Sequence, residues 1–189
     1  LISNISGTQN SGFGYRSLFS NTIGGQNSAF GFKALNDNTT GNYNTAVGHS
    51  ALYSNIFGVY NTAVGRSSLY SNTTGKFNSA FGYSTLNANI VGSKNSAFGY
   101  RALFSNTTNN NSAFGYKALF ANTTGIGNIA VGYVSLQANT TGSYNVSVGN
   151  GTLYANTIGS KNSAFGYGAA FANTTGKNNS AFGYNALSA

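Results

Sequence analysis

A five-residue motif, Asn-Ser-Ala-Phe-Gly or a close variant, recurs along the whole chain at an almost constant interval. It starts at Asn10, Asn27, Asn44, Asn61, Asn78, Asn95, Asn111, Asn128, Asn145, Asn162 and Asn179. Successive starts are 17 residues apart, except that the step from Asn95 to Asn111 is 16. Such a period indicates units that stack on one another. The sequence therefore predicts a single repeat array over residues 1–189, with about eleven coils.

The composition of each unit favours extended segments and corners. With the first Asn as position 0, position 4 is always Gly and position 14 is Gly except at Asn109. Two Gly per unit and many β-branched residues disfavour helices, whereas Gly and Asn favour corners. We expect an all-β fold, a parallel β-solenoid (β-roll) of 17-residue coils, with extended runs at positions 0–3 and about 5–9. The missing residue is assigned to the turn at Asn109-Asn110.

Three columns are expected to hold the coils together, because a unit this short shares its core with its neighbours. Position 3 is always Phe or Val, and position 8 is Leu in every unit but one. We predict inward ladders from Phe30, Val47, Val64, Phe81 and Phe98 and from Leu35, Leu52, Leu69, Leu86 and Leu103. Position 11 predicts an amide ladder, left-handed corners or both, at Asn38, Asn55, Asn72, Asn89 and Asn106. The Gly corners need positive φ or close backbone approach.

The aromatic residues at positions 5 and 9 predict self-association. Because the interior of a coil is thin, burial of its apolar side chains offsets little of the conformational entropy lost when the chain becomes ordered. If these aromatic side chains were all exposed, they would form an apolar stripe of the kind found at interfaces. A closed homotrimer is the simplest way to cover them, and an end-to-end filament is the alternative.

The Asn-Thr-Ala-Val-Gly units at Asn44 and Asn61, each followed by a small residue and Leu, resemble the head repeats of trimeric autotransporter adhesins. Similar arrays resemble segments of phage and giant-virus fibre proteins and of bacterial surface proteins. The resemblance covers the whole chain. It implies a left-handed β-roll with three chains around one axis, located extracellularly on a cell or virion. The adhesin unit is shorter and has an aliphatic residue before Ala, whereas position 1 here is usually Ser or Thr.

Residues of the types used for catalysis and metal binding are scarce. Asp37 is the one acid, His49 the one histidine, and the chain has no Cys. Acid–base and nucleophilic catalysis need partnered groups, and metal sites need several ligands. We therefore expect no enzymatic activity and no catalytic, metal or cofactor-binding residue. Asp37 and His49 are interpreted as surface residues on different faces.

The net charge of +8 comes from nine basic residues spread along the array. This is not the dense patch typical of nucleic-acid binding, and no apolar run is long enough for a membrane-inserted helix. Two basic bands occur, at positions 5–6 and 15–16. They either attract anionic glycans or keep rods from sticking laterally. Candidate contacts for a host-surface glycan or receptor are Tyr83, Tyr100, Tyr116, Arg101 and Lys117.

The Asn-Thr-Thr turns leave two further interpretations open. Asn38, Asn72, Asn106, Asn122, Asn139 and Asn173 match the N-glycosylation pattern, although corner formation alone explains them. The Thr columns suggest ice binding, but Ile56 and Ile90 interrupt them. The chain also opens in mid-coil, as a piece of a longer fibre protein would. We expect a structural fibre or adhesin segment; the alternatives are a self-polymerising filament subunit and a glycan-binding or ice-binding solenoid.

Overall fold

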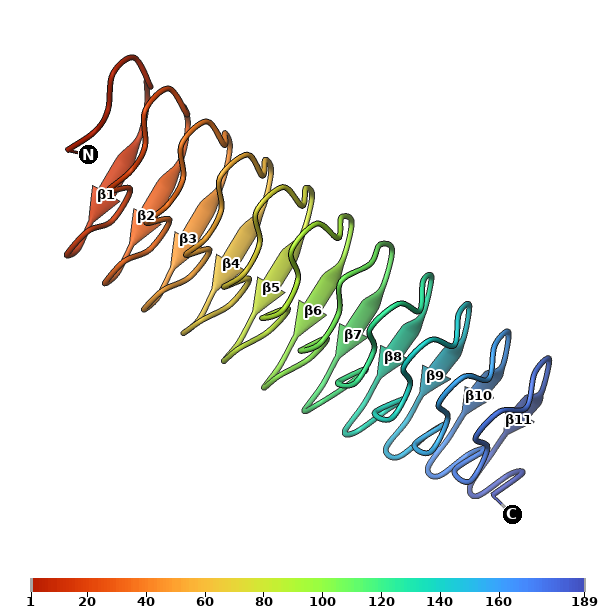
Figure 1. Cartoon of the computed structure of the whole chain (residues 1–189). Helices are drawn as coiled ribbons and strands as arrows, with labels where there is room; N and C mark the ends of the chain where they lie inside the picture. The colour runs from red at the N-terminus through yellow and green to blue at the C-terminus, as the bar shows by residue number, and fades with distance from the viewer. Residues whose placement is uncertain (1, 189) are drawn as a thin grey trace.

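The computed structural model describes residues 2–188 as a rod of stacked coils, each with one short strand (Figure 1). The strands are β1 (Ser11–Phe13), β2 (Ser28–Phe30), β3 (Thr45–Val47), β4 (Thr62–Val64), β5 (Ser79–Phe81), β6 (Ser96–Phe98), β7 (Ser112–Phe114), β8 (Ile129–Val131), β9 (Val146–Val148), β10 (Ser163–Phe165) and β11 (Ser180–Phe182). They form one parallel sheet in sequence order, with equivalent positions paired. The predicted parallel β-solenoid of 17-residue coils is therefore confirmed, with about ten turns.

The segment at positions 5–9 is a turn, so the prediction of a second extended run was wrong. Its backbone has positive φ at positions 6 and 8, for example 54° at Lys33 and 50° at Leu35. Few non-Gly residues adopt this region. The turn is nonetheless bonded along the rod: Leu35 N–H donates to Ala51 O at 3.0 Å, and Lys33 N–H donates to Tyr15 O at 2.8 Å. Alternate donors thus point to the following and the preceding coil, as they would from a strand.

The interior is lined by the Ala of position 2 and the Leu of position 8. The predicted leucine ladder is confirmed, since Leu35, Leu52, Leu69, Leu86 and Leu103 are all fully buried. Ala63 and Ala97 on the strands are also fully buried. The small residue of position 7, such as Ala34, Ala51 or Ala102, is fully buried as well. Small side chains and one leucine thus fill most coils, which leaves no room for a ring.

The predicted inward ladder of Phe and Val was wrong. Phe30 is 41% exposed and Val47 is 37% exposed, while Val64, Phe81 and Phe98 are half-buried. Side chains alternate between the two faces of a strand. Because the Ala of position 2 points inward, positions 1 and 3 must both point outward.

Two columns of asparagine run through the interior. At position 11, Asn72 Nδ2 donates to Asn55 Oδ1 at 2.8 Å and to Gly75 O at 3.1 Å. The predicted ladder is confirmed, since Asn38, Asn55, Asn72, Asn89 and Asn106 are fully buried. Position 0 forms a second ladder that was not predicted. There, Asn95 N–H donates to Asn78 Oδ1 at 3.0 Å, and Asn95 Nδ2 donates to the same atom at 3.2 Å.

The glycines at repeat positions 4 and 14 are required for different structural reasons. At position 4, Gly99 has φ 127°, and a Cβ there would lie 2.8 Å from the carbonyl carbon of Gly115. At position 14, Gly75 has no such φ, but a Cβ would overlap Asn72 Oδ1 and the Gly92 carbonyl oxygen. Position 4 therefore needs both positive φ and close approach, whereas position 14 needs only close approach.

The 16-residue coil is shortened within its Asn-Thr-Thr turn, which corrects the assignment to Asn109-Asn110. Thr108 O accepts hydrogen bonds from Asn106 Nδ2 at 2.9 Å and from Asn95 Nδ2 at 2.7 Å. In the other coils the Gly of position 14 supplies this carbonyl. Thr108 therefore takes position 14, and Asn109 follows it at position 15.

This shortened turn breaks the position-11 ladder. Asn106 Nδ2 donates to its own turn and makes no bond to Asn89, while Asn122 Nδ2 still donates to Asn106 Oδ1 at 2.7 Å. Within residues 2–188, the buried Oδ1 of Asn89 has no hydrogen-bond partner. An unpaired buried acceptor destabilises the fold, so this coil is a weak point of the rod.

Candidate functional site

Aromatic side chains at position 5 stack into a column on the outside of the rod. The ring centroids of Tyr83 and Tyr100 are 5.4 Å apart, those of Tyr100 and Tyr116 5.2 Å, and those of Tyr116 and Tyr133 5.1 Å. The rings are nearly parallel, because each follows the coil spacing. A second column forms at position 9, where Phe104 stacks on Phe120 at 5.3 Å.

Basic side chains at position 6 lie between these two aromatic columns. The guanidinium carbon of Arg101 is 5.5 Å from the ring centre of Tyr100 and 5.2 Å from that of Phe104. Arg16 makes the same arrangement with Tyr15 and Phe19, and Lys117 makes it with Tyr116 and Phe120. Lys33 lies over Phe32 of its own coil and over Tyr53 of the following coil. Such cation–π contacts are favourable. We call positions 5, 6 and 9 together the aromatic–basic ridge.

The structure brings the five candidate glycan contacts together on the aromatic–basic ridge. They are Tyr83, Tyr100, Tyr116, Arg101 and Lys117. Neighbouring rings and basic groups cover the faces of these tyrosines, so a sugar would meet ring edges and hydroxyl groups. Glycan contact at this place stays a prediction.

The sequence carries a signal for the ridge that the predictions above did not include. Basic residues at position 6 have an aromatic residue directly before them and often another three residues later, as in Tyr100, Arg101 and Phe104. In an extended strand, positions 5 and 9 share a face and position 6 points away from it. The three side chains converge only because positions 5–9 form a turn with positive φ at positions 6 and 8.

Asp37 and His49 occupy separate environments. Asp37 Oδ1 accepts a hydrogen bond from Asn36 Nδ2 at 2.6 Å. The His49 ring stacks on Phe32 with centroids 4.8 Å apart, and its Nδ1 lies 3.0 Å from Ser50 Oγ. Partial burial raises the pKa of the Tyr53 phenol, and the nearby Asp37 carboxylate raises it further. No three His, Cys, Asp or Glu residues cluster as metal ligands in the described part of the chain.

The Asn-Thr-Thr turns face solvent through Thr rather than Asn. Asn38, Asn72, Asn106, Asn122 and Asn139 are fully buried. Their amide nitrogens donate within the rod, so the folded chain leaves no room for a glycan on them. The hydroxyl of the first Thr in most of these turns also bonds along the rod, as when Thr73 Oγ1 donates to Ile90 O at 3.1 Å. That hydroxyl therefore keeps only acceptor capacity for solvent.

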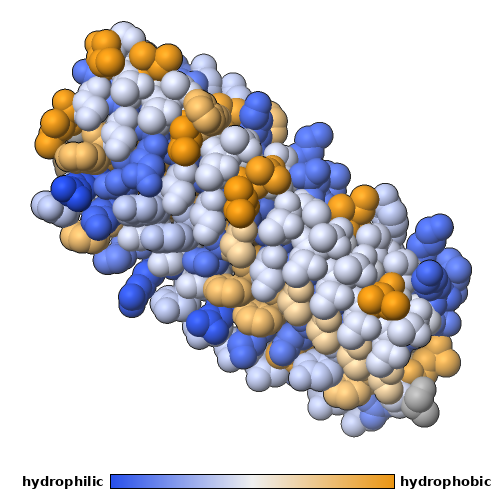
Figure 2. All heavy atoms as spheres, in the orientation of Figure 1, coloured by the Kyte–Doolittle hydropathy of each residue, from blue (hydrophilic) through white to orange (hydrophobic). Residues whose placement is uncertain are grey.

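The outer face of the sheet carries a continuous apolar column at position 3 and no charged residue. Position 3 holds only Phe or Val, and position 1 holds only Ser, Thr, Ile or Val. The Phe rings stack here too, with centroids 4.7 Å apart for Phe81 and Phe98 and 5.0 Å for Phe98 and Phe114. We call positions 1 and 3 together the strand face. On the side seen in Figure 2, the most hydrophobic residues occur as separate groups among hydrophilic ones.

Comparison of the chain with protein-family models, with curated proteins and with solved structures gives no match. Among the described residues, no helix is long and apolar enough to cross a membrane. The ladders, the strand face and the aromatic–basic ridge are therefore the features of this chain that bear on its function.

Proposed function

We propose that the chain is a structural rod segment of an extracellular fibre or adhesin on a cell or virion surface, in which three copies pack side by side. The strand face carries this proposal. A single chain leaves an outward column of Phe and Val along all eleven strands. Large apolar stripes of this kind mark interfaces, and packing the copies along the stripe would cover it.

Charge supports the strand face as the contact surface. The basic bands lie at positions 5–6 and 15–16, whereas positions 1 and 3 carry no charge in any unit. Copies that met through the strand face would keep their basic side chains in solvent and away from one another. The resemblance of the Asn44 and Asn61 units to trimeric adhesin heads points the same way.

The mass of the species in solution, measured by light scattering across a dilution series, tests this proposal. We expect a trimer that persists on dilution. A monomer at all concentrations would overturn the proposal. Polymers that lengthen with concentration would also overturn it and favour the filament subunit.

A matched pair of variants tests which surface mediates the contact. Val47→Lys places a charge on the strand face, and Val91→Lys places the same charge on an exposed turn. We expect Val47→Lys to give monomers with an unchanged circular dichroism spectrum, because three like charges would meet at the interface. Val91→Lys should remain trimeric. Dissociation of both variants, or of neither, would exclude the strand face as the interface.

Glycan binding is a second candidate function, because the ridge gathers the Tyr83, Tyr100 and Tyr116 hydroxyls beside Arg101 and Lys117. Binding of anionic oligosaccharides by the isolated array, measured on a glycan surface, tests it. Replacement of the three tyrosines by Leu should abolish the signal. Equal binding by the variant would exclude this role for the ridge.

A further inference from the structure

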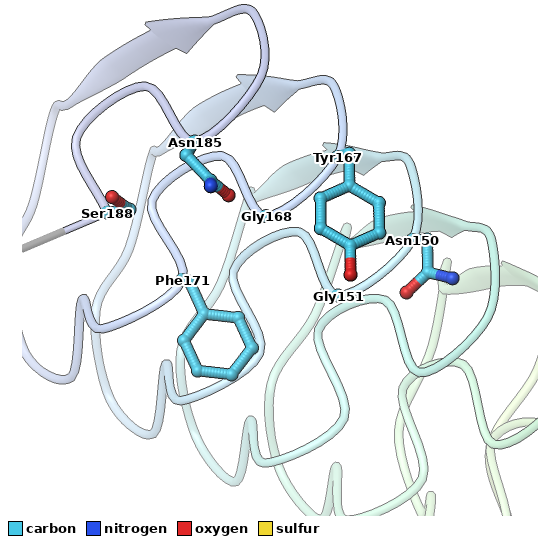
Figure 3. Close-up of a pocket in the computed structure, with 7 residues that line it drawn as sticks. All are labelled: Asn150, Gly151, Tyr167, Gly168, Phe171, Asn185 and Ser188. Carbon is cyan, nitrogen blue, oxygen red and sulfur yellow. The ribbon is translucent and has the colours of Figure 1, made fainter.

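A pocket lies where the aromatic–basic ridge lacks its basic residue. Its volume is about 270 Å³, and it is bordered by Tyr167, Phe171, Gly151, Gly168 and the side chain of Asn185 (Figure 3). The rings of Tyr167 and Phe171 lie on two sides of the pocket, and Gly151 and Gly168 contribute no side chain to it. The pocket is thus a gap in the ridge. In other coils a basic side chain fills the equivalent space.

In the coil that starts at Asn95, Arg101 occupies the equivalent place. Tyr167, Gly168 and Phe171 stand at positions 5, 6 and 9, like Tyr100, Arg101 and Phe104. The guanidinium of Arg101 lies over both of its aromatic neighbours. Without such a group, Tyr167 is 55% exposed, compared with 39% for Tyr100.

We propose that the pocket binds an external organic cation, with a guanidinium or alkylammonium head held between the rings of Tyr167 and Phe171. The faces of aromatic rings carry negative potential and attract cations without any acidic residue. The one acid of the chain, Asp37, lies far away along the array. The side-chain oxygens of Asn150 and Asn185, which also line the pocket, can accept hydrogen bonds from the N–H groups of the cation.

The ridge itself favours a cation over a sugar. In four coils, the side chain found between the aromatic columns is Arg16, Lys33, Arg101 or Lys117, each within cation–π distance of two rings. Beyond Lys117, position 6 holds no basic residue. This end of the ridge therefore keeps the aromatic walls but carries no charge of its own to repel a cation.

Glycine is not required by the backbone at this position. Gly151 has φ 63°, and Ser67 at the same repeat position has φ 56°. A Cβ on Gly151 would meet only the Phe171 ring, at an ordinary contact distance of 3.6 Å. The absence of a side chain opens the pocket, and a long side chain can be introduced there because other coils hold non-Gly residues in the same backbone conformation.

Titrations of the full chain, followed by NMR at the Gly151 and Gly168 amides, test the proposal. The probes are choline and arginine methyl ester, with 3,3-dimethylbutanol as the neutral isostere of choline and methyl glucoside as a sugar. We expect saturable shifts at millimolar cation and about tenfold weaker binding of the neutral isostere. No shift with either cation, or equal or stronger binding of the isostere or the sugar, would overturn the proposal.

Variants assign the binding to this pocket. Gly151→Arg introduces a long basic side chain from the preceding coil against the Phe171 ring, so it should occupy the pocket and remove the response to choline. Ser67→Arg adds the same charge at the same repeat position in a distant coil, so it should bind like the parent. Phe171→Leu removes one wall at an exposed position and should weaken binding several-fold. Unchanged binding in both Gly151→Arg and Phe171→Leu would overturn the assignment. None of these readouts depends on the trimer.

Discussion

The inward and outward columns of one coil obey different constraints. Inward positions repeat almost without change: Asn at 0 and 11, Gly at 4, Leu at 8. Each inward group contacts its own equivalent one coil away, so a change at one level disturbs two others. Outward position 5 tolerates Tyr, Phe, His, Arg and Asn. The inside therefore specifies the rod, and differences between coils that matter for binding are found outside.

The largest contrast is expected from a charge placed inside or outside one coil. Leu103→Asp buries a carboxylate in the fully enclosed leucine column and should cost several kcal/mol of unfolding free energy. Tyr100→Asp, three residues earlier on the ridge, should cost about 1 kcal/mol or less. Urea unfolding of both variants measures the difference. Similar losses would contradict the assignment of the leucine column to the interior.

Two glycines offer a contrast in backbone requirement. Gly99→Ala introduces a Cβ at φ 127° against the Gly115 backbone and should cost about 2–4 kcal/mol. Gly151→Ala stands at a left-handed φ that Ser and Arg adopt in other coils and has room for the Cβ, so it should cost only about 1 kcal/mol. Thermal unfolding distinguishes them. Equal destabilisation would mean that position 6 needs glycine after all.

Removal of a buried amide and removal of an exposed amide should differ less in their effect on the unfolding free energy. Asn72→Ala removes the donor to Asn55 Oδ1 and to Gly75 O and should cost about 1–3 kcal/mol. Asn150→Ala, on the outer surface, should be nearly neutral. Chemical denaturation tests the pair, and a neutral Asn72→Ala would show that the ladder adds nothing to stability.

The smallest change in stability is expected for the 16-residue coil, in which the position-11 ladder is interrupted. Insertion of one Gly between Thr108 and Asn109 should restore the Asn-Thr-Thr-Gly turn and let Asn106 donate to Asn89 Oδ1. We expect a gain of about 1–2 kcal/mol in unfolding free energy. The same insertion between Asn42 and Tyr43, in a regular coil, should destabilise. Hydrogen exchange of the Asn106 side-chain amide reports the new bond, and its absence would contradict the position-14 role of Thr108.

The repeat period and the invariant columns made the solenoid, the leucine column and the Asn ladder predictable. The direction of position 3 was not predicted, because Phe and Val are larger than the Ala of position 2 and look like better core residues. Only the narrowness of the coil decides that Ala63 and Ala97 point inward. The position-5-to-9 turn was missed because positive φ at Leu35 and its equivalents has no signature in residue type. The ridge and its pocket depend on that turn.

The alternation of donors toward the preceding and following coils orients the backbone hydrogen bonds along the rod. A pull along the rod would therefore load these bonds lengthwise, and coils would separate one at a time, beginning where the position-11 ladder is broken between Asn89 and Asn106. Each coil released frees 17 residues of chain, roughly 55 Å when fully extended. Such a rod would lengthen under tension in equal steps and shorten again coil by coil once the tension falls.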